Sequence, residues 1–437
     1  MDAVLPRPEL QADTAGLGSA ATLRYGLMGF ALAFVALPLY VLLPHYYALH
    51  FGLPLGTLGA LLLAARFLDA LVDPLLGRGV NALLRTSPYR ALAWGAGAAL
   101  ALGAGFAGLW FPLWTQGDAL LLNLAASLVL TYLAFSALTI GHQSWGALLG
   151  GDALQRARVV AWREGLGLGG VLVASVAGTL WDMHISVALL WLALALAWWG
   201  WRSGPQPGAA SAVPAAPSSP APPQGALLLP FSNPAFRALF GVFMLNGIAS
   251  ALPATLMLFF VQDLLQAASG MQAVFLATYF LCGALGMGGW LWLVSRWGLV
   301  RSWLAGMLLA CAVFLCAATL GPGDAWGYAA VCAGSGLALG ADLALPGALL
   351  AGITQQAERA GSDQAGSYFG WWSCATKLNL ALAAGLALPA LAAWGYQPGA
   401  QGPQALRALT WAYCLLPCAL KLAAAGLLHF FHSRKIL

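Results

Sequence analysis

Apolar residues form long runs along this chain, and short polar segments separate them. Each run holds about twenty residues, which is enough for an α-helix to cross the hydrocarbon core of a bilayer. The pattern predicts twelve membrane-spanning helices, at residues 22–44, 56–79, 91–111, 119–148, 159–181, 185–201, 236–260, 271–295, 303–320, 326–350, 369–392 and 408–430. The sequence therefore predicts an all-α membrane protein.

Composition agrees with this class. Charged residues make up 8% of the chain and hydrophobic residues 61%, proportions that exclude an ordinary soluble domain. The net charge of +5 does not indicate a nucleic-acid partner, because the basic residues are scattered over short loops. We expect a monomer in a lipid bilayer with a small-molecule substrate.

The loop charges predict how the helices are oriented. Loops on one side carry Arg78, Arg85, Arg90, Arg156, Arg158, Arg202, Arg237, Arg296, Arg301, Arg359, Arg434 and Lys435. Loops on the other side carry Asp118, Asp182, Asp263 and Asp324, with Arg407 as the basic exception. Since basic loops stay in the cytoplasm, we expect an inner-membrane protein of a bacterium with both termini cytoplasmic. The first twenty residues have no pattern of a removable signal peptide.

A segment rich in Pro, Ala and Ser divides the chain into two halves. Its composition cannot bury a core, so residues 202–235 are interpreted as a flexible cytoplasmic linker. The predicted units are a tail at 1–21, a six-helix bundle at 22–201, the linker, a second six-helix bundle at 236–430 and a tail at 431–437. Two bundles that rock about a central site are typical of transporters, and the fold class suggested is the major facilitator superfamily.

The second predicted span contains charged residues that hydrocarbon cannot accommodate. Arg66, Asp69 and Asp73 are three and four residues apart and therefore share one helix face. The two carboxylates must face a bundle interior or a wet cavity, and we interpret them as a cation site. A structural ion pair of Arg66 with Asp69, with Asp73 as a cap near the cytoplasmic end, is the alternative.

Spans four and five supply further polar candidates. Thr139, His142 and Gln143 form a polar cluster in span four, where His142 is either a buried core residue or part of a cavity lining. Arg163 and Glu164 lie about one turn inside span five. We favour the cavity for this pair over a position at the membrane interface.

Two more charges lie in consecutive spans of the second half. Asp342 is in span ten, and Lys377 is in span eleven with Trp372 and Thr376 close by. Mutual pairing of Asp342 with Lys377 is one interpretation, and a lysine that exchanges partners during transport is the other. Lys421 in span twelve has no motif around it and receives no role.

Other chemistry finds little support in the sequence. The seven cysteines lie in apolar segments without metal-ligand spacing, and the motifs His-Glu-x-x-His and Gly-x-Ser-x-Gly are missing. We therefore expect neither an enzyme nor a resident cofactor or metal.

Four motifs resemble the glycoside-pentoside-hexuronide:cation symporters, the melibiose permease-like branch of the major facilitator superfamily. They are Arg66-x-x-Asp69-x-x-x-Asp73-Pro-x-x-Gly77, Trp162-Arg163-Glu164, Gly340-Ala-Asp342-Leu-x-Leu-Pro346, and Gly366-x-Tyr368-Phe-Gly-x-Trp372 followed by Lys377. They are spread over both halves of the chain.

The resemblance implies that Asp69 and Asp73 hold the coupling ion, H⁺ or Na⁺, with an oxygen from span four such as Thr139. It also implies that Arg163 and Lys377 link this site to the substrate. Val72 stands where the family often has an amide that would suit sodium, so a proton is a serious alternative. Uncharged residues, Ala33 and Leu138 or Thr139, stand at the family's sugar-binding carboxylates.

The function expected is therefore symport of a cation with a sugar-like, anionic solute such as a hexuronide or sulfonated sugar. Arg163, Lys377 and His142 are its expected anion-binding residues, with Gln143, Trp372 and Thr376 beside them. A lysophospholipid translocator of the same fold and a non-transporting sensor or assembly factor are the alternatives.

Overall fold

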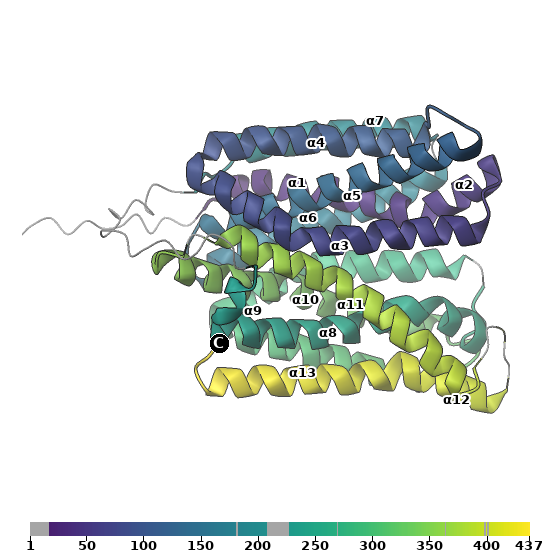
Figure 1. Ribbon diagram of the computed structural model, residues 1–437. Helices are drawn as coiled ribbons and strands as arrows, with labels where there is room; N and C mark the ends of the chain where they lie inside the picture. Colours follow the sequence, from purple (N-terminus) through teal and green to yellow (C-terminus); the bar gives the residue numbers. More distant parts are fainter. Residues whose placement is uncertain are drawn as a thin grey trace, which may run out of the picture.

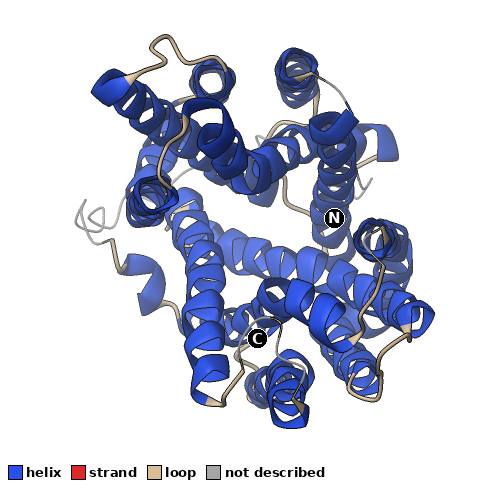
Figure 2. Ribbon diagram, turned by 90° about the vertical axis from the view of Figure 1, so that its right-hand side faces the viewer, coloured by secondary structure: helices blue, strands red, loops and turns tan. Residues whose placement is uncertain are grey.

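The computed structural model describes residues 17–180, 182–207, 227–268, 270–362, 364–396, 399 and 402–437. Its secondary structure over these residues is helical, and long helices run side by side in two groups (Figure 1). Figure 2 looks nearly along the helix axes. Helix covers most or all of each predicted span, as the apolar pattern requires.

The first group contains the helices of the N-terminal half. They are α1 (Ser19–Leu37), α2 (Leu43–Phe51), α3 (Leu55–Thr86), α4 (Pro88–Trp110), α5 (Gly117–Leu148), α6 (Ala153–Leu180) and α7 (Met183–Ser203). A π-helical turn, Pro38–Leu42, joins α1 to α2, so the two form one predicted span. Pro38 lacks a backbone N–H, which explains why regular hydrogen bonding changes there.

The second group contains the helices of the C-terminal half. They are α8 (Pro234–Phe259), α9 (Met271–Ala317), α10 (Ala325–Arg359), α11 (Ala365–Ala393), α12 (Pro403–Thr410) and α13 (Leu416–Ser433). A short 3₁₀ turn, Leu229–Ser232, precedes α8, and π-helical turns follow α8 (Phe260–Leu264) and α12 (Trp411–Leu415). Most of the predicted tail 1–21 and of the predicted linker 202–235 lies outside the described residues.

The long helix α9 contains two predicted spans. Gly298 breaks its regular geometry, with φ of 78° and ψ of 173°. Positive φ is readily adopted only by glycine, so this residue allows the chain to change direction between the spans at 271–295 and 303–320. Eight helical segments of the described chain are long and apolar enough to cross a membrane on length and composition alone.

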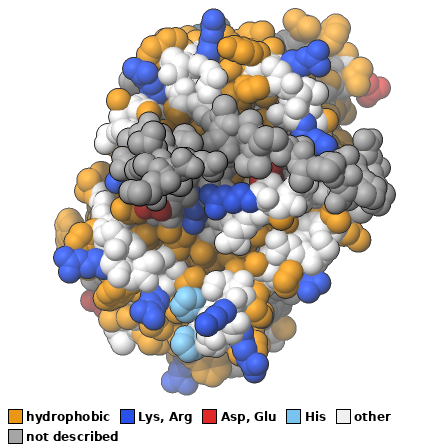
Figure 3. Space-filling model, turned by 90° about the vertical axis from the view of Figure 1, so that its left-hand side faces the viewer, with side chains coloured by type: hydrophobic (Ala, Val, Ile, Leu, Met, Phe, Trp, Pro, Cys, Tyr) orange, Lys and Arg blue, Asp and Glu red, His pale blue; other side chains and the backbone are white. Residues whose placement is uncertain are grey.

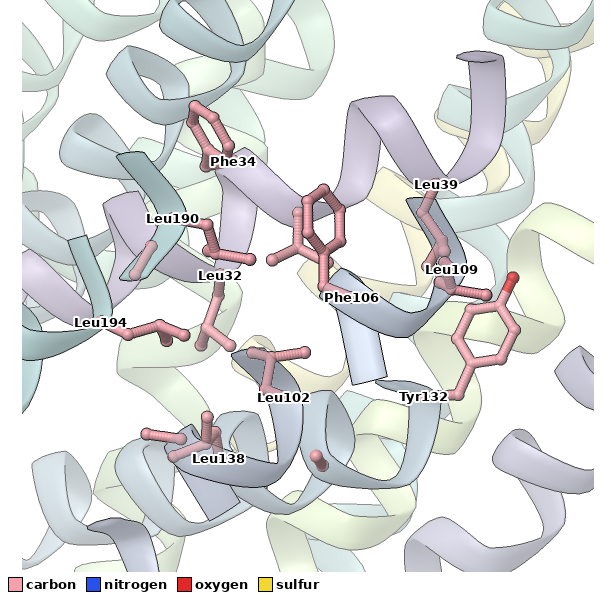
Figure 4. Packing of buried hydrophobic residues seen from close by; sticks show 14 of the residues in the cluster. Leu32, Phe34, Leu39, Leu102, Phe106, Leu109, Tyr132, Leu138, Leu190 and Leu194 are labelled. Carbon is pink, nitrogen blue, oxygen red and sulfur yellow. The ribbon is translucent and has the colours of Figure 1, made fainter. Parts of the chain in front are cut away.

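Buried apolar side chains gather in three clusters over the described residues. One lies within the N-terminal half, and Figure 4 shows part of it, including Leu32, Phe106 and Leu138. Another lies within the C-terminal half. The third combines residues of both halves, such as Val80 and Ala348, so apolar packing joins the bundles.

Some of the described polar contacts between the bundles lie near one end of the molecule. Asn81 of α3 donates to Ser367 Oγ of α11 at 2.7 Å and accepts from the Gly366 amide at 2.5 Å. Arg156 of α6 donates to Gln355 Oε1 of α10 at 3.0 Å. The chain's C-terminus lies at the same end, and Figure 3 shows Lys and Arg side chains spread over this face.

Candidate functional site

The ammonium group of Lys377 lies between two carboxylates of the other bundle. Its Nζ atom is 2.6 Å from Asp69 Oδ2 and 2.8 Å from Asp73 Oδ1. Nζ also donates to Ser136 Oγ at 2.6 Å, and this hydroxyl donates to Asp69 Oδ1 at 2.6 Å. One lysine from α11 is therefore held by three residues from α3 and α5.

Glycines set the close approach of α11 to α3 that makes this contact possible. A Cβ atom on Gly370 would lie 2.7 Å from the Asp73 carbonyl oxygen, so no larger residue fits there. Lys377 follows Gly370 by seven residues, two helical turns, and hence lies on the same face of α11. The family motif residues around Asp73 and Gly370 thus form one contact surface.

This cluster is almost closed to water. Asp73 is fully buried and Asp69 is 3% exposed, while the Lys377 side chain is 16% exposed. The second oxygen of Asp73, Oδ2, is buried without a hydrogen-bond partner among the described residues. Buried charges are tolerated when they are paired. The cluster is therefore a site for one positive charge, and Lys377 supplies that charge in this conformation.

The oxygen from α5 in this cluster belongs to Ser136 and not to Thr139. The Thr139 hydroxyl is buried and has no hydrogen-bond partner within the described structure, so it does not contribute to this cluster, and its expected ligand role stays a prediction. Ser136 precedes it by three residues, nearly one turn, and faces α3. Serine in an apolar run is a weak signal, and only the position of α3 could have selected it.

The alternative interpretation of Asp73 as a helix cap does not hold. Asp73 lies inside α3, which continues to Thr86. Arg66, its neighbour on the same face, interacts with Tyr132 of α5. The two acids and the two bases of this region formally cancel in charge.

Arg163 and Glu164 form an ion pair with each other on α6. The Gln143 amide, turned so that its oxygen faces Arg163, accepts from the two terminal guanidinium nitrogens at 2.5 and 2.8 Å. The side chains of Arg163 and Glu164 are 13% and 23% exposed, so open space reaches both. Three of the predicted residues thus form a second polar group in the N-terminal bundle.

His142 is not a lining residue in this conformation. It is fully buried, and its ring stacks on Tyr25 with centroids 4.0 Å apart and meets Trp201 edge-on at 5.1 Å. Neither ring nitrogen has a hydrogen-bond partner among the described residues. His142 is a core residue in this structure, as one of its two interpretations has it, and its part in substrate binding stays a prediction.

Trp372 and Thr376 lie on α11 close to Lys377. Trp372 is buried and stacks on Phe243 of α8 with centroids 3.7 Å apart. Thr376 is exposed and donates to the Trp372 carbonyl oxygen at 3.0 Å. Of the two, Thr376 is the side chain that a solute can reach.

Asp342 does not pair with Lys377. Its Oδ2 atom is 2.6 Å from Lys421 Nζ, so mutual pairing of Asp342 with Lys377 is wrong for this conformation, and Lys421 has a partner. Asn246 and Trp303 donate to Oδ1 at 3.1 and 2.9 Å. A lysine within an apolar span was the signal for this network, because such a charge requires a partner.

The described residues contain no group of three or more His, Cys, Asp or Glu side chains that could hold a metal ion.

Comparison with known proteins decides the family. A family model described as MFS/sugar transport protein matches residues 23–434, nearly the whole chain. The chain belongs to this family. It is therefore a major facilitator superfamily transporter and not an enzyme, and multiple helices cross the membrane.

Solved structures of the superfamily share the fold. A bacterial homologue of the iron transporter ferroportin in an outward-facing state has a TM-score of 0.67 at 15% identity, over 95% of this chain and 99% of that chain. The E. coli fucose:proton symporter FucP has a TM-score of 0.64 at 16% identity, over 93% and 97%. No curated protein sequence matches this MFS protein.

Proposed function

We propose that this transporter couples entry of one cation to movement of a sugar-like, anionic solute, as a member of the glycoside-pentoside-hexuronide:cation symporters. One observation carries the proposal: Lys377 of the C-terminal bundle occupies the Asp69–Asp73 pair of the N-terminal bundle. The lysine holds the place of a cation at a contact between the two bundles.

The ammonium group and a free cation compete for the same oxygens. Asp69, Asp73 and Ser136 supply oxygen atoms within 2.8 Å of Nζ, and the same oxygens can bind a sodium ion or, at the carboxylates, a proton. A cation that enters the site therefore displaces Lys377. The displaced ammonium group then requires a new anionic partner, because a bare charge is unfavourable in a poorly hydrated interior.

Charge balance indicates what that partner is. Two acids and two bases cancel around Asp69, Asp73, Lys377 and Arg66, so the empty carrier is neutral there. One bound cation adds a positive charge, and a monoanionic solute on Lys377 removes it. Occlusion of the site is favourable only for the neutral states, which are the empty and the doubly loaded carrier. Because of this rule, the gradient of the cation drives the movement of the solute.

Both H⁺ and Na⁺ fit the proposal. FucP is a fucose:proton symporter, which supports a proton. Val72 between the two acids contributes no oxygen, which also favours a proton over sodium. Arg163 is partly exposed and Thr376 is exposed, so both polar groups are available to hold other parts of the solute.

We further infer an inner-membrane location in a bacterium, with both termini in the cytoplasm and a single chain as the working unit. The basic side chains of the face in Figure 3 support this orientation.

Uptake into proteoliposomes tests the function. Labelled methyl β-D-glucuronide is offered beside neutral methyl β-D-glucoside and a lysophospholipid, under an inward proton or sodium gradient. We expect accumulation of the glucuronide with one of the two ions, unaffected by an imposed membrane potential because the loaded site is neutral.

Other results assign the protein differently. Uptake of the lysophospholipid alone would identify a lipid translocator of the same fold. No flux of any solute under either gradient would contradict symport and support a sensor or assembly factor.

A further inference from the structure

A second polar group in the C-terminal bundle reaches open space through one side chain. Ser250 of α8 is exposed, although Asp342 and Lys421 beside it are 13% and 6% exposed. Its Oγ atom donates to Asp342 Oδ2 at 3.2 Å and accepts from Lys421 Nζ at 3.0 Å. The hydroxyl is therefore the accessible end of a buried ion pair.

The direction of the Ser250 side chain favours an opening toward the protein interior over exposure to lipid. The side chain contacts Asp342 of α10 and Lys421 of α13, so it points toward two other helices of its own bundle. An exposed side chain with this direction indicates a recess between those helices. Polar groups at such a recess are hydrated, since bare carboxylates and ammonium groups are unfavourable next to hydrocarbon.

The donors and acceptors already used at this recess show which hydrogen bond is left for a solute. Asp342 Oδ1 accepts from Asn246 and Trp303, and Oδ2 accepts from Lys421 and Ser250. Lys421 uses its three donors on Asp342, Asn246 and Ser250. Ser250 has used its one donor and one of its two lone pairs. The group can therefore accept one more hydrogen bond, at Ser250 Oγ.

The recess also lies near the charged site that we assign to the anion. Asn379 of α11 packs against Gly247 of α8, where an added Cβ would overlap its amide. Ser250 follows Gly247 by three residues, and Lys377 precedes Asn379 by two. Both helices run from the face in Figure 3 toward the opposite end, so Ser250 and Lys377 are about 7.5 Å apart along the bundle axis, from the helical rise of 1.5 Å per residue.

We propose that Ser250, oriented by the Asp342–Lys421 pair, is a subsite that accepts a hydrogen bond from a hydroxyl group of the solute. This inference rests on the proposed function for the solute class and adds the second point of attachment.

Thiol labelling tests whether a solute can reach the subsite. The Ser250→Cys variant is treated with a water-soluble, sulfonated methanethiosulfonate, and mass spectrometry locates the label. The control is Ser302→Cys, since Ser302 is fully buried and donates only to a carbonyl oxygen of its own helix. We expect labelling of position 250 and none of position 302. Absence of label at position 250 would overturn the subsite without affecting the cation site.

Transport kinetics test the hydrogen bond. Ser250→Ala is compared with Thr255→Ala, whose hydroxyl donates only to the Ala251 carbonyl oxygen on the same helix. We expect Ser250→Ala to raise the KM for methyl β-D-glucuronide about 5- to 10-fold, which corresponds to one hydrogen bond of about 1 kcal/mol. Thr255→Ala leaves KM unchanged.

Deoxy derivatives of the glucuronide identify the hydroxyl that is bound. We expect one derivative to bind the unchanged protein more weakly than the full glucuronide does. The same derivative should bind Ser250→Ala no more weakly than the full glucuronide does. An equal loss with both proteins for every derivative would contradict the subsite. If the unchanged protein transports no glucuronide, the proposed function fails, and the labelling result still decides whether the recess is open to solutes.

Discussion

Gly77 of α3 and Gly366 of α11 pass each other in backbone contact. A Cβ atom on either glycine would lie 2.2 Å from the carbonyl oxygen of the other. Asn81, one turn after Gly77, binds both the Gly366 amide and the Ser367 hydroxyl. Two helices of different bundles are thus joined at one end of the molecule, and this junction must separate if that end opens.

Gly77→Ala is expected to weaken the junction. The added methyl group overlaps backbone that cannot rotate away, and overpacking of this kind costs about 1–3 kcal/mol. Gly79→Ala is the matched control, since a Cβ atom at Gly79 meets no atom within 4 Å. Thermal unfolding of the purified proteins should show a lower midpoint for Gly77→Ala only.

The accessibility of Asn81→Cys to a water-soluble thiol reagent provides a second readout. Labelling of the cysteine at position 81 should increase when Gly77→Ala is added to Asn81→Cys. Equal labelling and equal midpoints for Gly77→Ala and Gly79→Ala would show that the junction does not hold the bundles together.

The sequence was sufficient for the fold because hydrocarbon constrains it strongly. Twelve apolar runs predicted the positions of the helices, and Asp69 with Asp73 was recognised since carboxylates in a span need a polar environment. The two spans within α9 were also separated correctly in sequence, and Gly298 breaks the helical geometry between them.

Pairing between helices could not be predicted in the same way. Lys377 has two possible acidic partners on α3 and one on α10, and the sequence does not say which helix lies closer. Packing at Gly370 decides in favour of α3. Thr139 and Ser136 are equally plausible on periodicity, and His142 could turn toward either a cavity or the core. Each choice depends on how the helix is rotated about its own axis, and a difference of about half a turn changes the answer.

Lys377→Met should destabilise the protein. The substitution leaves Asp69 and Asp73 buried together without their ammonium partner, and breaking a buried pair typically costs about 3–5 kcal/mol. Adding Asp73→Asn removes one of the two charges and should restore part of the loss. Lys435→Met, at an exposed position near the C-terminus, is the control.

Denaturant or thermal unfolding is measured for the unchanged protein, Lys377→Met, Asp73→Asn and the double variant. The four free energies of unfolding give the interaction energy between Lys377 and Asp73. A double variant that is as unstable as the sum of its single variants would show that the pair does not interact as described.

Ser136→Ala and Thr139→Ala should differ in their effect on the coupling ion. Ser136 binds both Asp69 and Lys377, so its loss removes hydrogen bonds to charged groups that are worth about 1.5–3 kcal/mol each. The hydroxyl of Thr139 makes no such bond.

The ion concentration for half-maximal uptake should therefore change at least 10-fold with Ser136→Ala and less than 2-fold with Thr139→Ala. The reverse order would restore Thr139 as the ligand and contradict the position of Ser136.

The most direct test of the cation site compares accumulation with exchange for Asp73→Asn in proteoliposomes. Asp118→Asn, at an exposed acid in the first turn of α5, serves as the control. The proposed coupling predicts that Asp73→Asn abolishes gradient-driven accumulation of methyl β-D-glucuronide while exchange of internal for external solute persists, and that Asp118→Asn changes neither. Full accumulation by Asp73→Asn would contradict a cation site at Asp69 and Asp73.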